Sequence, residues 1–181
     1  MFFSTRFVYI HIPRTGGTTL TDSFGCLTYV SKCVHHHKHD TAREIKTLVG
    51  SGLWDNAYKF TVMRNPVEIC KSWFRHCVQY QPGGFETGDW VGYCQYLREI
   101  AWRGFVEQEV LTGRFVRKGG FLATYCNLPD IAVLSLPNAW QYLTGVTGHN
   151  PPQPRIGETR RLPIDGYEEA IMDHCHLDPT T

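Results

Sequence analysis

The chain has 181 residues, with 42% hydrophobic and 19% charged side chains, which predicts one folded domain over residues 1–181 and excludes an intrinsically disordered protein. Eighteen Lys and Arg residues nearly balance 17 Asp and Glu residues, so the net charge of +1 excludes a general nucleic-acid binder as a function class. No apolar run approaches the roughly 20 residues that a membrane span needs, so no span is expected.

The first half of the chain alternates between the patterns of strands and helices. This alternation is typical of βαβ units and predicts an α/β fold with a mostly parallel central sheet. The expected elements are a strand at 7–12, a helix at 20–24, a helix that starts with the capping box at 41–44 and ends at the Gly-Ser-Gly of 50–52, a strand at 57–63 and a helix at 67–78.

The second half has weaker patterns and a Pro-rich segment at 150–163. Its expected elements are a long helix from Asp89 to about residue 108, a strand at 131–136, a helix at 138–146 and a last helix from Asp165 to about residue 176.

The seven cysteines are an odd number, and none lies in a C-x-x-C pair. We therefore expect mostly buried thiols rather than disulfides or zinc ligands, in a reducing compartment. The first residues also lack the order of a signal peptide. These features predict a soluble protein of the cytoplasm.

The loop between the first strand and the first helix has the composition of an anion site. It contains a glycine pair directly before a helix N-terminus, where backbone N–H groups and the helix dipole favour a negative charge. One cation and several hydroxyl groups add further donors. A plain strand–turn–helix junction, with glycines for tight packing, is the alternative. The candidate binding residues are Arg14, Thr15, Gly16, Gly17, Thr18 and Thr19.

A nucleotide-kinase loop fits this stretch less well. A Walker A loop reads G-x-x-x-x-G-K-[ST], with lysine between the last glycine and the hydroxyl residue. Here Thr18 follows Gly17 directly, and the cation, Arg14, precedes the glycines. No strand ends in an obvious Asp that could bind Mg²⁺.

The stretch FVYIHIPRTGGTTL resembles the 5′-phosphosulfate-binding loop of carbohydrate-type sulfotransferases, which use 3′-phosphoadenosine 5′-phosphosulfate (PAPS). The family's usual wording is H-I-P-K-T-G-G-T-[ST], and Arg14 stands here where lysine is usual. The resemblance implies a single three-layer domain of the P-loop NTPase type, with helices on both faces of the sheet. It also implies that Arg14 contacts the transferring sulfuryl group.

A second stretch, FTVMRNPVEICKSWF, resembles the family's 3′-phosphate-binding segment. By that resemblance, Arg64 and Ser72 hold the 3′-phosphate. The chemistry is suitable, because an arginine at the end of a strand can bind a phosphate with two hydrogen bonds and a serine adds a hydroxyl. The resemblance covers about residues 7–80, the expected cofactor-binding core, and becomes vague over residues 81–181, the expected acceptor side.

A histidine cluster lies between the two motifs, and three interpretations of it stay open: a solvated loop, a metal site and a catalytic base. Related sulfotransferases carry H-x-H or a lone histidine in this stretch as the general base. A neutral imidazole can take the proton of an attacking hydroxyl. We favour His39, directly before the capped helix, with His37 as the second candidate, and expect no metal. The cluster consists of His35, His36, His37 and His39.

The sequence therefore predicts an enzyme that transfers a sulfuryl group from PAPS to a hydroxyl of a carbohydrate or other small alcohol. The product of the cofactor is 3′-phosphoadenosine 5′-phosphate (PAP). The alternatives are a P-loop nucleotide kinase or NTPase and a non-catalytic nucleotide-binding protein. The identity of the acceptor and the oligomeric state do not follow from the sequence.

Overall fold

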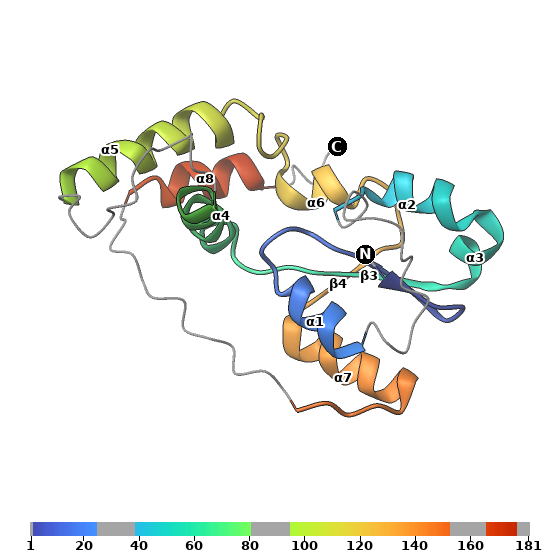
Figure 1. Cartoon of the computed structure of the whole chain (residues 1–181). Coiled ribbons are helices and arrows are strands. Elements are labelled where there is room, and N and C mark those ends of the chain that lie inside the picture. Colours follow the sequence, from blue (N-terminus) through green and yellow to red (C-terminus); the bar gives the residue numbers. More distant parts are fainter. Residues whose placement is uncertain (1, 25–38, 81–94, 153–165, 177–181) are drawn as a thin grey trace. The chain divides into compact units, whose positions relative to one another are not determined.

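The computed structural model describes residues 2–24, 39–80, 95–152 and 166–176, and their contacts divide between two compact units (Figure 1). The first unit comprises Met1–Arg64 and Leu122–Gly157, and the second comprises Asn65–Phe121 and Glu158–Thr181. Each unit has its own packing, described separately below. The assignment of residues 1–181 to one domain stays a prediction.

The first unit is built on a four-stranded sheet with the spatial order β1-β2-β3-β4. Strand β1 pairs antiparallel with β2, whereas β2, β3 and β4 are parallel. In the parallel part, Tyr9 lies opposite Phe60, which in turn lies opposite Ala132. The α/β class and the mostly parallel sheet are thus confirmed. The strands are β1 (Phe2–Phe3), β2 (Phe7–Ile10), β3 (Tyr58–Val62) and β4 (Ala132–Leu134).

Helices lie against both faces of this sheet. Successive side chains of a strand point to opposite faces, so β2 serves two apolar clusters. Phe7 and Tyr9 pack with α1 (Gly17–Phe24) and α7 (Leu136–Thr147) on one face. Val8 and Ile10 pack with α2 (Ala42–Val49) and α3 (Ser51–Asn56) on the other. The end of a short helix, α6 (Gly120–Tyr125), also contributes to this second cluster.

The strand predicted at 7–12 ends earlier, at Ile10. Side-chain hydroxyl groups bind the carbonyl groups of Ile10 and Ile12. The hydroxyl of Thr61 donates to the carbonyl of Ile10 at 2.8 Å, and the hydroxyl of Thr15 donates to that of Ile12 at 2.8 Å. The main chain therefore leaves the sheet two residues before Pro13 and enters the glycine-containing loop.

The predicted capping box at the start of α2 is confirmed. Thr41 is the N-cap, its hydroxyl accepts from the N–H of Glu44 at 3.4 Å, and the Glu44 carboxylate accepts from the N–H of Thr41 at 2.7 Å. Gly50, with φ of 81°, ends α2 as expected. The next residues do not form a loop, however, because α3 begins at once and buries Trp54 in the core.

The second unit is helical and has an aromatic core. Phe74 and Trp102 meet edge to face, with ring centroids 5.4 Å apart, and Phe105 packs against both rings. Its helix α5 passes into a π-helical segment, so the predicted regular helix to residue 108 is shorter than expected. Its elements are α4 (Pro66–Tyr80), α5 (Gln95–Phe105), the π-helical segment (Val106–Val110), the first residues of α6 and α8 (Glu168–Cys175).

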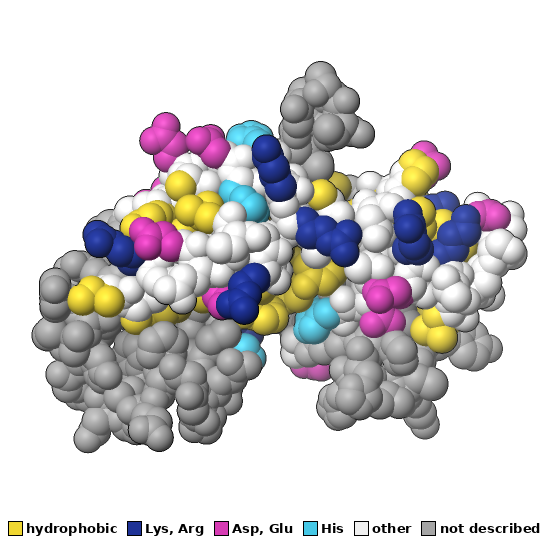
Figure 2. All heavy atoms as spheres, turned by 90° about the horizontal axis from the view of Figure 1, so that it is seen from above, with side chains coloured by type: hydrophobic (Ala, Val, Ile, Leu, Met, Phe, Trp, Pro, Cys, Tyr) yellow, Lys and Arg dark blue, Asp and Glu magenta, His cyan; other side chains and the backbone are white. Residues whose placement is uncertain are grey.

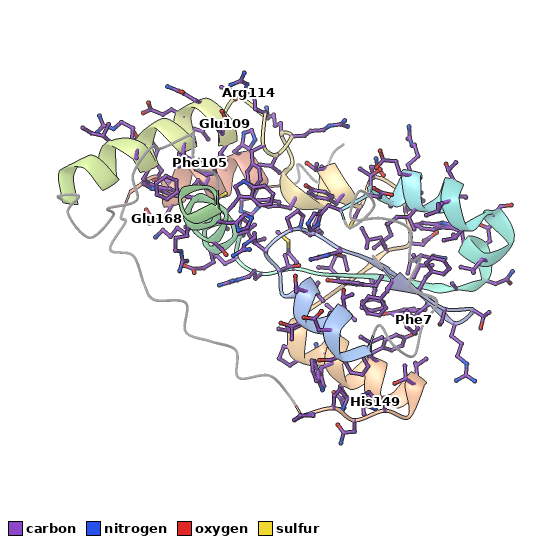
Figure 3. All side chains as sticks on the ribbon, viewed as in Figure 1. Phe7, Phe105, Glu109, Arg114, His149 and Glu168 are labelled. Atoms are coloured by element: carbon purple, nitrogen blue, oxygen red, sulfur yellow. The ribbon has the colours of Figure 1, made fainter. Side chains whose placement is uncertain are left out.

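Polar contacts connect distant parts of the second unit. The Lys71 ammonium donates to the carboxylate of Glu168, which is labelled in Figure 3, at 2.8 Å, and this contact links α4 to α8. Tyr167 precedes α8 with φ of 69°, and its hydroxyl donates to the carboxylate of Glu107 at 2.6 Å. These contacts hold α8, the last described helix, against segments that lie about 60 to 100 residues earlier.

The helix predicted at 138–146 begins two residues earlier, at Leu136, because Ser135 caps it. The Ser135 hydroxyl accepts from the N–H of Asn138 at 3.3 Å, and Gly148, with φ of 70°, ends the helix. The predicted start of the long helix at Asp89 lies outside the described residues.

Charges of both signs lie on the face of the described residues that Figure 2 draws. Figure 2 shows Lys and Arg side chains interspersed with Asp and Glu side chains, in keeping with the net charge of +1. Of the helices in the described part of the chain, none combines the length and apolar character that crossing a membrane requires.

Candidate functional site

The loop after β2 is a closed turn that places one cation on its outer side. Arg14 is exposed and has φ of 65°, a left-handed conformation that is uncommon for a residue other than glycine. Thr15 is 2% exposed, because its hydroxyl donates back to the carbonyl of Ile12. This internal hydrogen bond closes the turn and leaves Arg14 at the surface.

Close packing explains why both positions of the loop are occupied by glycine. Gly16 has φ of 96°, and a Cβ built there would lie 3.0 Å from the Leu136 side chain at the start of α7. A Cβ on Gly17 would lie 2.0 Å from the ring of His11. The alternative of a plain strand–turn–helix junction therefore has a physical basis, and the glycines alone do not argue for a ligand.

The start of α1 nevertheless has the geometry that suits an anion. The first hydrogen bond of the helix runs from the N–H of Leu20 to the carbonyl of Gly16, at 3.2 Å. The N–H groups of residues 17–19 thus precede the helical ladder, at the end where the helix dipole places about half a positive charge. Thr18 is exposed and Thr19 half-buried beside them. Phosphate or sulfate oxygens are the acceptors that such a helix start favours.

The structure brings His39 to this loop. Its ring centroid lies 4.5 Å from that of His11, although 28 residues separate the two in sequence. Nδ1 of His39 is 3.3 Å from the carbonyl oxygen of His11. A carbonyl only accepts hydrogen bonds, so this contact favours the tautomer with the proton on Nδ1 and the lone pair on Nε2. His39 is exposed at the surface.

The second candidate base, His37, lies outside the described residues, as do His35 and His36. Two residues after His39, the Thr41 capping box fixes the start of α2. The favoured base thus lies between a buried histidine and a well-defined helix start.

The two residues predicted for the 3′-phosphate lie in different units. Arg64 is exposed and follows β3 in the first unit, where the N–H of Met63 donates to the carbonyl of Leu134 at 3.1 Å. Ser72 lies on α4 in the second unit and is 4% exposed. Their joint action on one phosphate stays a prediction.

Sequence reasoning left the buried residues beneath the loop out of the site. His11 is 2% exposed and stacks on Tyr9, with ring centroids 5.8 Å apart and planes at 22°. Burial raises the pKa of Tyr9 above its ordinary value, so its phenol stays neutral at physiological pH. The alternation of Phe7, Tyr9 and His11 on one face was the available signal, since period-2 spacing places them in one row.

Burial disfavours the thiolate form of Cys70, Cys126 and Cys175. Burial raises the pKa of Cys126 to about 11 and that of Cys175 to about 11, and Cys70 is shifted upward by burial as well. All three are free thiols, in line with the prediction for these residues. Within the described ranges, no group of three His, Cys, Asp or Glu side chains is arranged to hold a metal ion.

Comparison of the chain with models of protein families, with curated proteins and with solved structures finds no match.

Proposed function

We propose that this protein is a sulfotransferase that uses PAPS and a hydroxyl-bearing acceptor, a carbohydrate or another small alcohol. The observation that carries the proposal is the contact between His39 and the end of β2, because it joins the predicted base to the predicted phosphosulfate loop. The first unit would then form the nucleotide-binding part of a three-layer fold of the P-loop NTPase type. We place the enzyme in the cytoplasm, because its described cysteines are free thiols.

The loop residues would hold the 5′ end of the cofactor. The N–H groups of residues 17–19 and the hydroxyl of Thr18 offer donors, and the Arg14 guanidinium offers a cation with several N–H groups. Arg64 would bind the 3′-phosphate, and Ser72 is the second candidate that the resemblance gives for this phosphate. PAPS supplies the sulfuryl group, whose bond to the 5′-phosphate breaks as the acceptor oxygen bonds to sulfur.

His39 would act as the general base. The tautomer favoured by the His11 carbonyl keeps the lone pair on Nε2, and this atom would take the proton of the acceptor hydroxyl. Arg14 would counter negative charge on the sulfuryl oxygens, and positioning and electrostatics would supply the rest of the catalysis. A sulfuryl group carries less charge than a phosphoryl group, so we expect turnover to survive EDTA.

A nucleotide-binding comparison tests the proposal against a kinase, an NTPase or a non-catalytic protein. A ligand at 100 times its Kd adds about 2.7 kcal/mol of stability, or a rise in Tm of roughly 5–10 °C for a protein of this size. We expect PAP to give such a rise at concentrations where ATP gives little. An Arg64→Ala variant should lose most of the difference between PAP and ATP, because Arg64 is the residue assigned to the 3′-phosphate.

Equal or larger stabilisation by ATP would contradict the sulfotransferase proposal and favour a kinase or NTPase. If PAP binds but radiolabelled PAPS delivers no sulfuryl group to any of a panel of sugars and alcohols, the non-catalytic alternative is favoured.

A further inference from the structure

His11 lies between the start of α1, which belongs to the proposed phosphosulfate loop, and His39, the proposed base. One side of its imidazole faces the backbone of Gly17, where even a methyl group would collide with the ring. The ring also contacts that of His39, with the two planes inclined at 54°, and it stacks on Tyr9. Contacts with three different segments hold this 2%-exposed ring in one orientation.

The main chain of His11 contributes a second contact. Its carbonyl oxygen is 3.3 Å from Nδ1 of His39, so the same residue meets both the face and one nitrogen of the base candidate. A hydrogen bond on one nitrogen of an imidazole determines which nitrogen carries the lone pair. Buried carbonyl partners orient catalytic and metal-binding histidines in this way.

We propose that His11 is a positioning residue, whose carbonyl selects the Nδ1–H tautomer of His39 and whose ring, packed against Gly17 at the start of α1, holds the ring of His39 in place. This inference rests on the proposed function for its catalytic consequence, but not for the tautomer. His11 touches no reacting atom in this scheme and acts only through His39 and the loop. The small residue required at position 17 is then part of the same arrangement, because it makes room for the ring.

The tautomer of His39 is measurable without substrate. In ¹⁵N-labelled wild-type protein above pH 8, long-range ¹H–¹⁵N spectra distinguish Nδ1–H from Nε2–H, and the signals absent from His39→Ala identify this residue. We expect His39 in the Nδ1–H form in the wild type and a mixture of both forms in His11→Ala, because this variant keeps the carbonyl but loses the ring that holds Nδ1 of His39 against it. Finding the Nε2–H form in the wild type would overturn the proposal, whatever the activity of the enzyme.

A double-mutant cycle tests the catalytic consequence. We expect His11→Ala to lower kcat about tenfold to a hundredfold in the wild-type background and less than twofold in the His39→Ala background, because residues that act as a unit are strongly non-additive. His11→Gln keeps some bulk against Gly17 and should show the same loss of kcat with a Tm nearer that of the wild type. Equal losses in both backgrounds would show that His11 does not act through His39.

Phe7→Leu is the control for a general effect of core damage. Phe7 is 1% exposed on the same face of β2 but at the far end of the strand, where it packs against Phe60 and Tyr142 (Figure 3). This variant should lower Tm without moving the His39 tautomer or kcat well below Tm. If the wild type shows the Nδ1–H tautomer but no sulfuryl transfer, the proposed function fails while the positioning contact stands.

Discussion

The two units differ in how they use polar side chains. In the first, Arg14 and Arg64 follow the C-terminal ends of the parallel strands β2 and β3, and both are exposed. In the second, Lys71 binds Glu168 at 2.8 Å through a side chain that is only 17% exposed, whereas the ion pair across helices in the first unit, Lys46 with Asp55, is longer and more exposed. Ligands of open parallel sheets bind at the C-terminal ends of the strands, so the first unit has the arrangement of a binding region.

The hydrophobic cores of the two units also differ in how they are built. The first unit packs helices on a sheet whose strands stop at a loop of unusual backbone conformation, with Arg14 and Gly16 at positive φ. The second packs aromatic rings of α4 and α5 against each other. We infer that substitutions in the loop region change binding and catalysis, whereas substitutions in the helical unit change mainly stability.

The largest expected effect lies at the proposed base. His39→Ala should lower kcat by about 10²–10⁴-fold, the usual range for a lost general base, because the variant lacks the imidazole assigned to take the acceptor proton. Binding of PAP, measured by calorimetry, should barely change. His37→Ala is the control: a larger loss of kcat there would assign the base to His37, and full kcat in His39→Ala would remove His39 from the mechanism.

Arg64 should decide between nucleotides with and without a 3′-phosphate. A charge-assisted contact of two hydrogen bonds contributes about 1.5–3 kcal/mol, so PAP should bind roughly tenfold to a hundredfold tighter than AMP. Arg64→Ala should abolish this preference, and Ser72→Ala tests whether the second unit contributes to it. Equal affinities of the wild type for PAP and AMP in calorimetry would refute the assignment of a 3′-phosphate site.

Gly17→Ala tests how tightly the loop is built. The new methyl group would meet the His11 ring, and overpacking of this kind destabilises by about 1–3 kcal/mol. Gly145→Ala is the matched control, because this glycine of α7 has no heavy atom within 4 Å of the added Cβ and alanine favours a helix by about 1 kcal/mol. Urea denaturation should show opposite signs for the two variants. A neutral Gly17→Ala would mean that the ring can move aside.

Much of the fold was predictable because the signals are local. The capping box at Thr41 lies within four residues, and the strand around Phe60 is a short run rich in aromatic and β-branched residues, so both were found with nearly correct bounds. Helices α3 and α6 were missed, because their glycines suggest loops and only the burial of Trp54 and Phe121 in the tertiary structure explains them. The two-residue strand β1 was not predictable either, because so short a segment forms a strand only by pairing with β2.

The site divides in the same way. The loop residues from Arg14 to Thr19 were predictable from one continuous motif, and placing His39 in the same site came from the resemblance. The contact of His39 with His11 was not predictable, because it depends on how 28 residues of chain return to the end of β2. His11 is both a buried residue stacked on Tyr9 and a contact of the candidate base.

The smallest effect is expected at the ion pair of the second unit, and its pH dependence has a defined sign. Burial alone would raise the pKa of Glu168, but the hydrogen bond and charge of Lys71, together with backbone hydrogen bonds at Glu168 and Gly166, outweigh it and lower the pKa below its ordinary value. The stabilisation is then present at neutral pH and disappears as the pH falls through the lowered pKa. The Glu168 side chain is 44% exposed, so after solvent screening the pair contributes only about 0.5–1 kcal/mol.

Glu168→Gln should therefore lower the free energy of unfolding at pH 7 by about this amount and have little effect at pH 3. Glu169→Gln, on the exposed next position of α8, is the control and should be neutral at both pH values. A Glu168→Gln effect that is equal at pH 7 and pH 3 would show that the carboxylate's charge does not connect α4 to α8.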